Sequence, residues 1–136
     1  MYEEDIIYYI LMLKGGEYTF RIVRYLILID WRYEELYGSK LTNFKYTLMP
    51  HTLSIEGFND LLSRLKFVEK ITSNGQTGKM IYLKLKGRVK INIPTNIMQI
   101  IEQVIRETEG LDDFTLNSIV VNSIKYKRLL SKTCTY

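Results

Sequence analysis

Basic side chains are the residues of this sequence whose type and spacing point most clearly to a chemistry. Between positions 64 and 90, eight lysine and arginine residues accompany a single acidic residue, whereas the whole chain of 136 residues carries a net charge of only +4. Cations concentrated in one stretch neutralise phosphates and release counterions when nucleic acid binds. A hairpin that lysines merely keep in solution would show the same pattern, and that alternative stays open. The basic residues of the block are Arg64, Lys66, Lys70, Lys79, Lys84, Lys86, Arg88 and Lys90.

A β-hairpin is the element that must present most of these cations. Two β-prone stretches flank a polar loop that contains an Asn-Gly dipeptide, which is typical of tight turns, so we predict a hairpin over residues 67–86. The alternation from Lys79 to Lys86 predicts an apolar face that anchors the hairpin and a lysine-bearing face that meets solvent. Asn74 and Gln76 lie near the tip, where amides bond to phosphates or to base edges.

Catalytic and metal-binding side chains are scarce. The sequence has one histidine, His51, and one cysteine, Cys134, so a disulfide framework and a cysteine-based zinc site are excluded within one chain. No glycine-rich phosphate loop of the common types is present. We therefore expect no enzymatic activity, no metal and no cofactor. Adjacent carboxylates are interpreted as solvated helix faces or as charges that complement a helix dipole; they are Glu3-Glu4-Asp5, Glu34-Glu35 and Asp112-Asp113.

Five helices are predicted from apolar residues at helical spacing. The second includes the run Tyr25–Ile29, which is apolar on every face and indicates a central, buried helix. Thr19 and Ser54 are the candidate N-caps of the second and third helices, and Pro94 suits the first turn of the fourth. The connector 39–53 contains one strand-like segment. The predicted helices cover residues 4–14, 19–37, 55–66, 94–109 and 113–130, and a loose tail follows over 131–136.

Three helices followed by a basic hairpin form the order of a winged-helix domain, in which a helix enters the major groove and the hairpin, or wing, follows the phosphate backbone. We therefore predict an α+β, mostly helical, single domain over residues 1–136, with a winged-helix-like core over 1–92 and a C-terminal helical pair over 93–130. Two features depart from a DNA-binding winged helix. The connector before the third helix is long, and that helix carries Glu56 and Asp60, whose carboxylates are unfavourable next to phosphates. Such a domain serves equally as a platform for a protein partner.

The sequence from Arg21 to Leu48 combines an aromatic-rich helix with Tyr37-Gly38-Ser39-Lys40-Leu41-Thr42 and a following Phe44. This stretch resembles the Panacea domain, the SocA-like antitoxin family, and the helix after Pro94 with the following Gly110-Leu111-Asp112 resembles the C-terminal half of that family. The family's aromatic-Gly-Pro motif is replaced here by Met49-Pro50-His51-Thr52. The resemblance implies a helical, winged scaffold without catalysis that binds a protein, as a toxin-neutralising antitoxin or as a protease adaptor.

Location and partners follow from the same observations. No apolar run approaches the roughly 20 residues of a membrane span, and residues 1–14 lack the basic start of a signal peptide, so we expect a cytoplasmic protein without membrane contact. The absence of alanine indicates a biased coding composition, as in an AT-rich archaeal or viral genome. The leading hypothesis is a small DNA-binding regulator whose partner is double-stranded DNA. The alternative is a Panacea-like antitoxin or adaptor whose partner is a toxin or a protease, and the sequence leaves a homodimer open.

Overall fold

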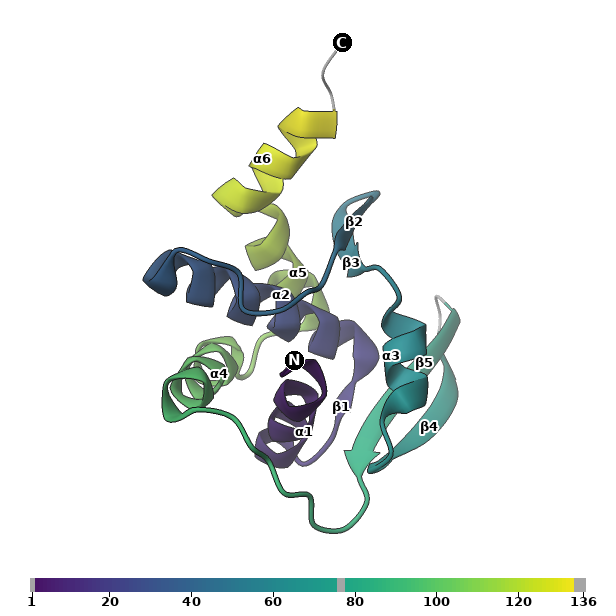
Figure 1. The fold of residues 1–136 in the computed structure, drawn as a ribbon. Coiled ribbons are helices and arrows are strands. Elements are labelled where there is room, and N and C mark those ends of the chain that lie inside the picture. The colour runs from purple at the N-terminus through teal and green to yellow at the C-terminus, as the bar shows by residue number, and fades with distance from the viewer. Residues whose placement is uncertain (1, 76–77, 134–136) are drawn as a thin grey trace.

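The structure, a computed structural model, describes residues 2–75 and 78–133. Within these residues the chain forms helices and short antiparallel sheets (Figure 1), so the predicted α+β, mostly helical class is confirmed. The described helices are α1 Glu3–Lys14, α2 Thr19–Tyr37, α3 Phe58–Arg64, α4 Thr95–Thr108, α5 Asp113–Val121 and α6 Ile124–Thr133. The described strands are β1 Glu17–Tyr18, β2 Tyr46–Met49, β3 Thr52–Ile55, β4 Val68–Gly75 and β5 Gly78–Leu85.

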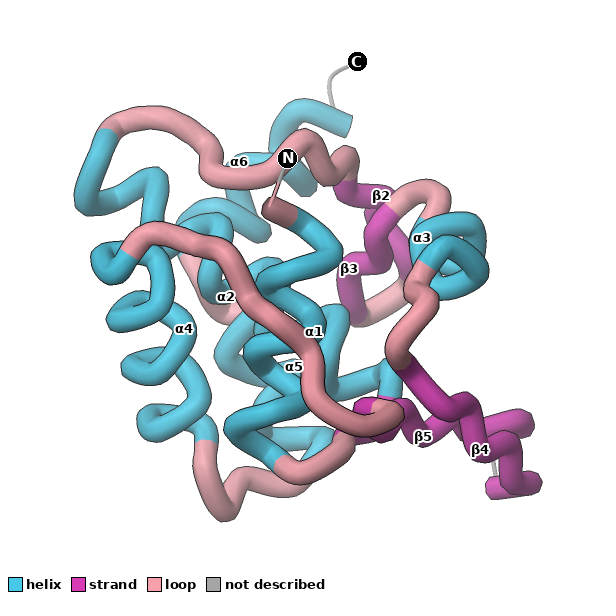
Figure 2. Tube along the Cα trace, turned by 60° about the horizontal axis from the view of Figure 1, so that its bottom comes forward, coloured by secondary structure: helices cyan, strands magenta, loops and turns pink. Residues whose placement is uncertain are grey.

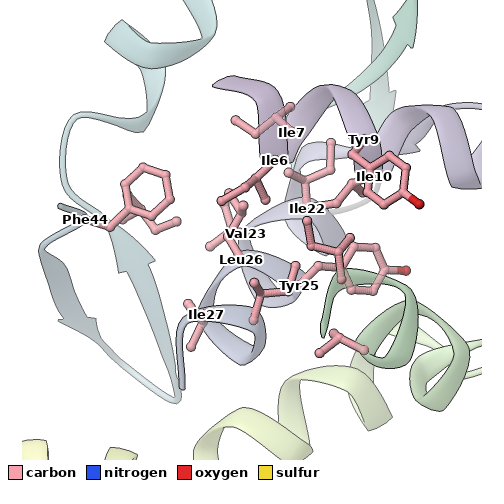
Figure 3. Close-up of a cluster of buried hydrophobic side chains, with 14 of the residues drawn as sticks. Ile6, Ile7, Tyr9, Ile10, Ile22, Val23, Tyr25, Leu26, Ile27 and Phe44 are labelled. Carbon is pink, nitrogen blue, oxygen red and sulfur yellow. The ribbon is translucent and has the colours of Figure 1, made fainter. Parts of the chain in front are cut away.

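Helix α2 is the centre of the molecule. It contacts α1, α4, α5, β1 and β5, which is why the run Tyr25–Ile29 has no polar face. Leu26 is 1% exposed, and Ile29 is completely buried, as the sequence predicted. Figure 3 shows side chains from α1 and α2 packed against one another with Phe44 from the connector at the edge of the cluster. This packing builds one core beneath the strands and the C-terminal helices.

The predicted hairpin forms the larger sheet. Strands β4 and β5 pair in antiparallel fashion, and the two-residue strand β1 joins the other edge of β5, which gives the strand order β1-β5-β4. Leu83 is completely buried where β5 contacts α1 and α2, so the base of the hairpin is anchored in the core. The far end of β4 and β5 extends away from the helices (Figure 2).

A second hairpin occupies the connector before α3. Strands β2 and β3 pair from Tyr46↔Ile55 to Met49↔Thr52, so the prediction that a helix begins at Ile55 is wrong. Ser54 lies in β3 and does not cap α3; the residue before the helix is Gly57, with a φ of 73° that glycine adopts without strain. Burial explains why this segment is a strand. Leu53 and Ile55 are both buried in β3, because alternate side chains of a strand point to the same face, whereas residues two positions apart on a helix do not.

The C-terminal part contains three described helices rather than the predicted pair. The helix expected over 113–130 is broken at Asn122 and Ser123, because the Ser123 hydroxyl accepts a hydrogen bond from the backbone amide of Tyr126 and thereby starts a new helix. Helix α6 continues to Thr133, so the first part of the predicted loose tail is helical, and residues 134–136 lie outside the described range. No helix in the described part of the chain is long and apolar enough to cross a membrane.

Candidate functional site: the basic hairpin

The basic hairpin, defined here as β4 and β5, carries lysines on both of its faces. Lys70 pairs directly with Leu83, and Lys79 pairs with Asn74, so both lysines belong to the inner face, which is the face of the buried Leu83. Lys84 belongs to the outer face, directly opposite Glu69. The predicted separation into an apolar face and a lysine-bearing face is therefore incomplete, because Lys79 lies on the opposite face from Lys84. Side chains alternate along a strand, and the two residues are an odd number of positions apart.

The inner-face lysines are nevertheless accessible. Lys79 is exposed because it lies at the free end of the hairpin. Lys70 lies opposite the buried Leu83 and is exposed because β4 is an edge strand of the sheet. Lys84 on the outer face is exposed as well. Among the described residues none of these three ammonium groups has an ion-pair partner within 4.0 Å, and this includes Glu69 opposite Lys84. The hairpin thus presents unpaired positive charge on two sides.

The remaining predicted cations surround the base of the hairpin. The backbone amide of Lys86 donates to the Phe67 carbonyl at 2.8 Å, which holds Lys86 beside the strand that starts after Lys66. Arg64 is the last residue of α3. Arg88 and Lys90 lie on the segment that leads from β5 to α4, and all of these side chains are exposed.

The predicted tip residues are only partly placed. Asn74 is exposed and pairs with Lys79 at the end of the hairpin. Gln76 lies outside the described residues, as does Cys134. His51 has a φ of 64° in the β2–β3 turn, and its backbone oxygen accepts a hydrogen bond from the Asn117 amide at 2.9 Å. Within the described ranges no group of three His, Cys, Asp or Glu side chains is arranged to hold a metal ion.

Helix α3, the candidate recognition helix, lies beside an acidic groove. An open groove of ≈ 1210 Å³ runs between the first turn of α1 and α3. It is lined by Glu56 and Asp60, the two carboxylates that the sequence analysis judged unfavourable next to phosphates. Three further carboxylates come from α1; they are Glu3, Glu4 and Asp5. Lys45, Arg64 and Lys66 only partly offset this charge. Sequence reasoning missed the contribution of α1, because only the tertiary fold brings residues 3–5 next to α3.

Asp30 is the polar residue that organises the motif Tyr37–Thr42. Its carboxylate is completely buried and accepts hydrogen bonds from the backbone amides of Leu41 and Thr42 at 3.1 and 3.0 Å, and from the Thr42 hydroxyl at 2.7 Å. The Tyr46 hydroxyl donates to the same carboxylate, and burial together with the Asp30 charge raises the pKa of Tyr46. The motif therefore fixes the connector to α2. In the sequence, the position of Asp30 directly after the apolar run Tyr25–Ile29 was the only indication that this carboxylate is buried and has a structural role.

Arg24 is a second buried polar residue that the sequence analysis did not single out. Its guanidinium donates to Thr52, to the Leu53 carbonyl and to Asn117, and it stacks on the Phe20 ring at 3.8 Å. Burial lowers the pKa of Arg24 to about 10, so the group remains a cation at neutral pH. Arg24 joins α2 to the β2–β3 hairpin and to α5.

Two surfaces are thus candidates for function: the basic hairpin with its unpaired lysines, and the acidic groove between α1 and α3. Among the residues that the structure describes, neither surface contains a set typical of a catalytic centre. No protein-family model, no curated protein and no solved structure matches this chain.

Proposed function

We propose that this protein binds nucleic acid without catalysing a reaction, as a small winged-helix DNA-binding regulator that uses its basic hairpin. The observation that carries the proposal is the set of exposed lysines without ion-pair partners on the projecting hairpin. The element order α1-β1-α2-β2-β3-α3-β4-β5, with β1 beside β5, supports the comparison with a winged helix that has an additional hairpin before α3. The comparison with a winged helix concerns the fold alone, and the proposed function rests on the exposed lysines.

The hairpin, and not α3, makes the main contacts in this proposal. Lysines on both faces reach phosphates on either side of the hairpin, as expected of a wing that lies along a backbone. The acidic groove repels phosphates from the surface around α3, so deep insertion of this helix into a major groove is disfavoured. We therefore expect binding that depends strongly on salt and weakly on base sequence.

A triple substitution of Lys79, Lys84 and Lys86 by Gln tests the proposal. Each phosphate contact that is lost should reduce the slope of log affinity against log salt concentration by about 0.9, so the triple variant should lose roughly 2–3 units of slope. A salt series of duplex binding, read by fluorescence anisotropy, measures this. The matched control removes three cations from α6 by changing Lys127, Arg128 and Lys132 to Gln, and it should keep the wild-type slope.

Two results would contradict the proposal. One is the absence of duplex binding by the wild-type protein at about 50 mM salt and micromolar concentration, where non-specific binding is expected. The other is an equal loss of slope in the α6 control, because net charge alone would then explain binding.

The second candidate function is that of a Panacea-like antitoxin or adaptor that binds a protein. The specific observation in its favour is the acidic groove, which also contains the apolar side chains of Phe58 and Phe67 and so suits a basic, partly apolar segment of a partner. Reversal of one groove charge by Asp60→Lys should abolish neutralisation of a toxin encoded by a neighbouring gene, measured by growth on co-expression. The same change should leave duplex binding unaffected or stronger.

A further inference from the structure

The outer face of the β1-β5-β4 sheet carries an aromatic and apolar row that the proposed duplex contacts do not use. The register places Tyr18 directly beside Tyr82, and Tyr82 directly beside Ile71, so one row crosses all three strands. Tyr18 is 37% exposed and Ile71 is 46% exposed, and Tyr82 is half-buried between them. The solvent face of an antiparallel sheet is ordinarily polar, so this row calls for a function.

The two tyrosines are held in a fixed arrangement. Their ring centroids lie 5.0 Å apart with an interplanar angle of 73°, which is the edge-to-face geometry that aromatic pairs favour. Tyr82 also lies against the backbone of Gly16, where a Cβ atom would overlap the tyrosine hydroxyl. Gly16 has a φ of 124°, a conformation that favours glycine on its own account. The row is therefore preorganised rather than a loose set of exposed side chains.

Unpaired cations lie next to the aromatic row. Lys84 is two residues from Tyr82 on the same strand and on the same face, and Lys86 follows at the base of the hairpin. Toward the free end, Met80 continues the apolar surface of the outer face. Aromatic rings flanked by free cations match a nucleic-acid strand whose bases are exposed, because the rings stack on bases while the ammonium groups meet phosphates.

We propose that this outer face binds single-stranded nucleic acid, with unstacked bases on Tyr18 and Tyr82 and the backbone along Lys84 and Lys86. The inference rests on the proposed nucleic-acid binding and names its preferred substrate. Bases in a duplex are already stacked on one another and are not free to cover the two rings, whereas the phosphates of both substrates meet the same lysines. The protein should therefore bind a single strand more tightly than the duplex that contains it.

Fluorescence anisotropy on one labelled strand of about 16 nucleotides, alone and annealed to its complement, tests the inference at a fixed salt concentration. Tyr18→Ala should weaken single-strand binding about 5- to 100-fold and leave duplex binding unchanged. Tyr18→Phe keeps the ring and should bind like the wild type. Tyr82→Leu keeps a large apolar side chain in the sheet and should also weaken single-strand binding. Tyr37→Ala removes an exposed tyrosine at the far end of α2 and serves as the matched control.

The outcomes separate this inference from the proposed function. The outer face is not the site if the wild type binds duplex at least as tightly as single strand, or if Tyr18→Ala and Tyr82→Leu change neither affinity. In that case a loss of salt slope in the lysine triple variant would still support the proposed function. If neither substrate binds, both proposals fail. A concentration-dependent dimer that Tyr18→Ala converts to monomer, measured by light scattering, would also overturn the inference and assign the row to a second copy of the chain.

Discussion

Tyr25 and Asp30 show how polar side chains enter the core of this protein. Both are completely buried on α2, and both have hydrogen-bond partners that replace lost water. The Tyr25 hydroxyl donates to Glu17 at 3.1 Å and accepts from Arg21 at the same distance, so it links α2 to β1. Removing one partner of such a group leaves another buried and unpaired, which costs more than the bond itself contributes.

Buried tyrosines make the stability of the fold decrease at alkaline pH. Burial, helped by Glu102, raises the pKa of Tyr9 from 10.0 to about 12. Burial is also the main cause that raises the pKa of Tyr25 to about 12, with Glu17 adding to the shift and Arg21 opposing it. Above pH 10 the unfolded chain has lost these protons while the folded chain keeps them. Stability is therefore complete below about pH 10 and falls above it by about 1.4 kcal/mol per pH unit for each tyrosine, up to the folded pKa.

Denaturant titrations at several pH values between about 8 and 11.5 measure this slope. Tyr25→Phe should reduce the slope above pH 10 by about 1.4 kcal/mol per pH unit, because the substituted residue no longer titrates. Tyr37→Phe, at an exposed position of the same helix, is the control variant. Equal slopes for wild type and Tyr25→Phe would show that Tyr25 does not retain its proton in the folded state.

At the scale of elements, α2 should contribute most to the free energy of unfolding. Leu26→Ala removes a side chain that is buried among α1, α2 and the connector (Figure 3) and leaves a cavity there, so it should cost about 2–5 kcal/mol. Leu36→Ala, near the exposed end of the same helix, should change stability by less than about 0.5 kcal/mol. Urea titrations followed by the fluorescence of Trp31 measure both. A cost below about 1 kcal/mol for Leu26→Ala would contradict its place in the core.

Elements with a complete local signal were predictable, and those that depend on tertiary contacts were not. The apolar spacing of α1, α2 and α4 and the turn signal of the basic hairpin placed these elements to within a few residues. The β2–β3 hairpin was missed because its turn, Pro50-His51, lacks the usual glycine and places His51 at positive φ. The break between α5 and α6 was missed because Asn122 and Ser123 do not by themselves stop a helix.

At the scale of the molecule, the sequence predicted the charge of the candidate site better than its shape. The exposure of the basic residues was expected, whereas their division between two faces follows from the register with β4. The carboxylates of α1 and the row from Tyr18 to Ile71 are assembled from distant segments, so no local pattern reveals them. Both surfaces depend on α1 and β1 packing correctly against the rest of the fold.

The predicted boundary near residue 92 should not separate an independently folding unit. Helix α4 contacts both α1 and α2, and it buries apolar side chains against them; these are Ile97, Ile100, Ile101 and Val104. Burial of one such side chain contributes about 1.5–3 kcal/mol to the free energy of unfolding. Truncation removes four of them and also exposes the faces of α1 and α2 that they cover. The combined loss exceeds the typical free energy of unfolding of about 5–15 kcal/mol. A fragment that ends at residue 92 should therefore show no cooperative unfolding transition and should bind a hydrophobic dye.

A fragment that ends at Ser123 should behave differently. It keeps α4 and α5 and loses only α6, which projects from the body in Figure 1 and is attached through the buried Tyr126 and the 2.6 Å ion pair between Lys125 and Glu34. We expect cooperative unfolding with a loss of about 2–3 kcal/mol, and nucleic-acid binding by the hairpin should persist. Calorimetry and anisotropy on both fragments measure this contrast. Cooperative unfolding of the shorter fragment would show that the first 92 residues contain a complete core of their own.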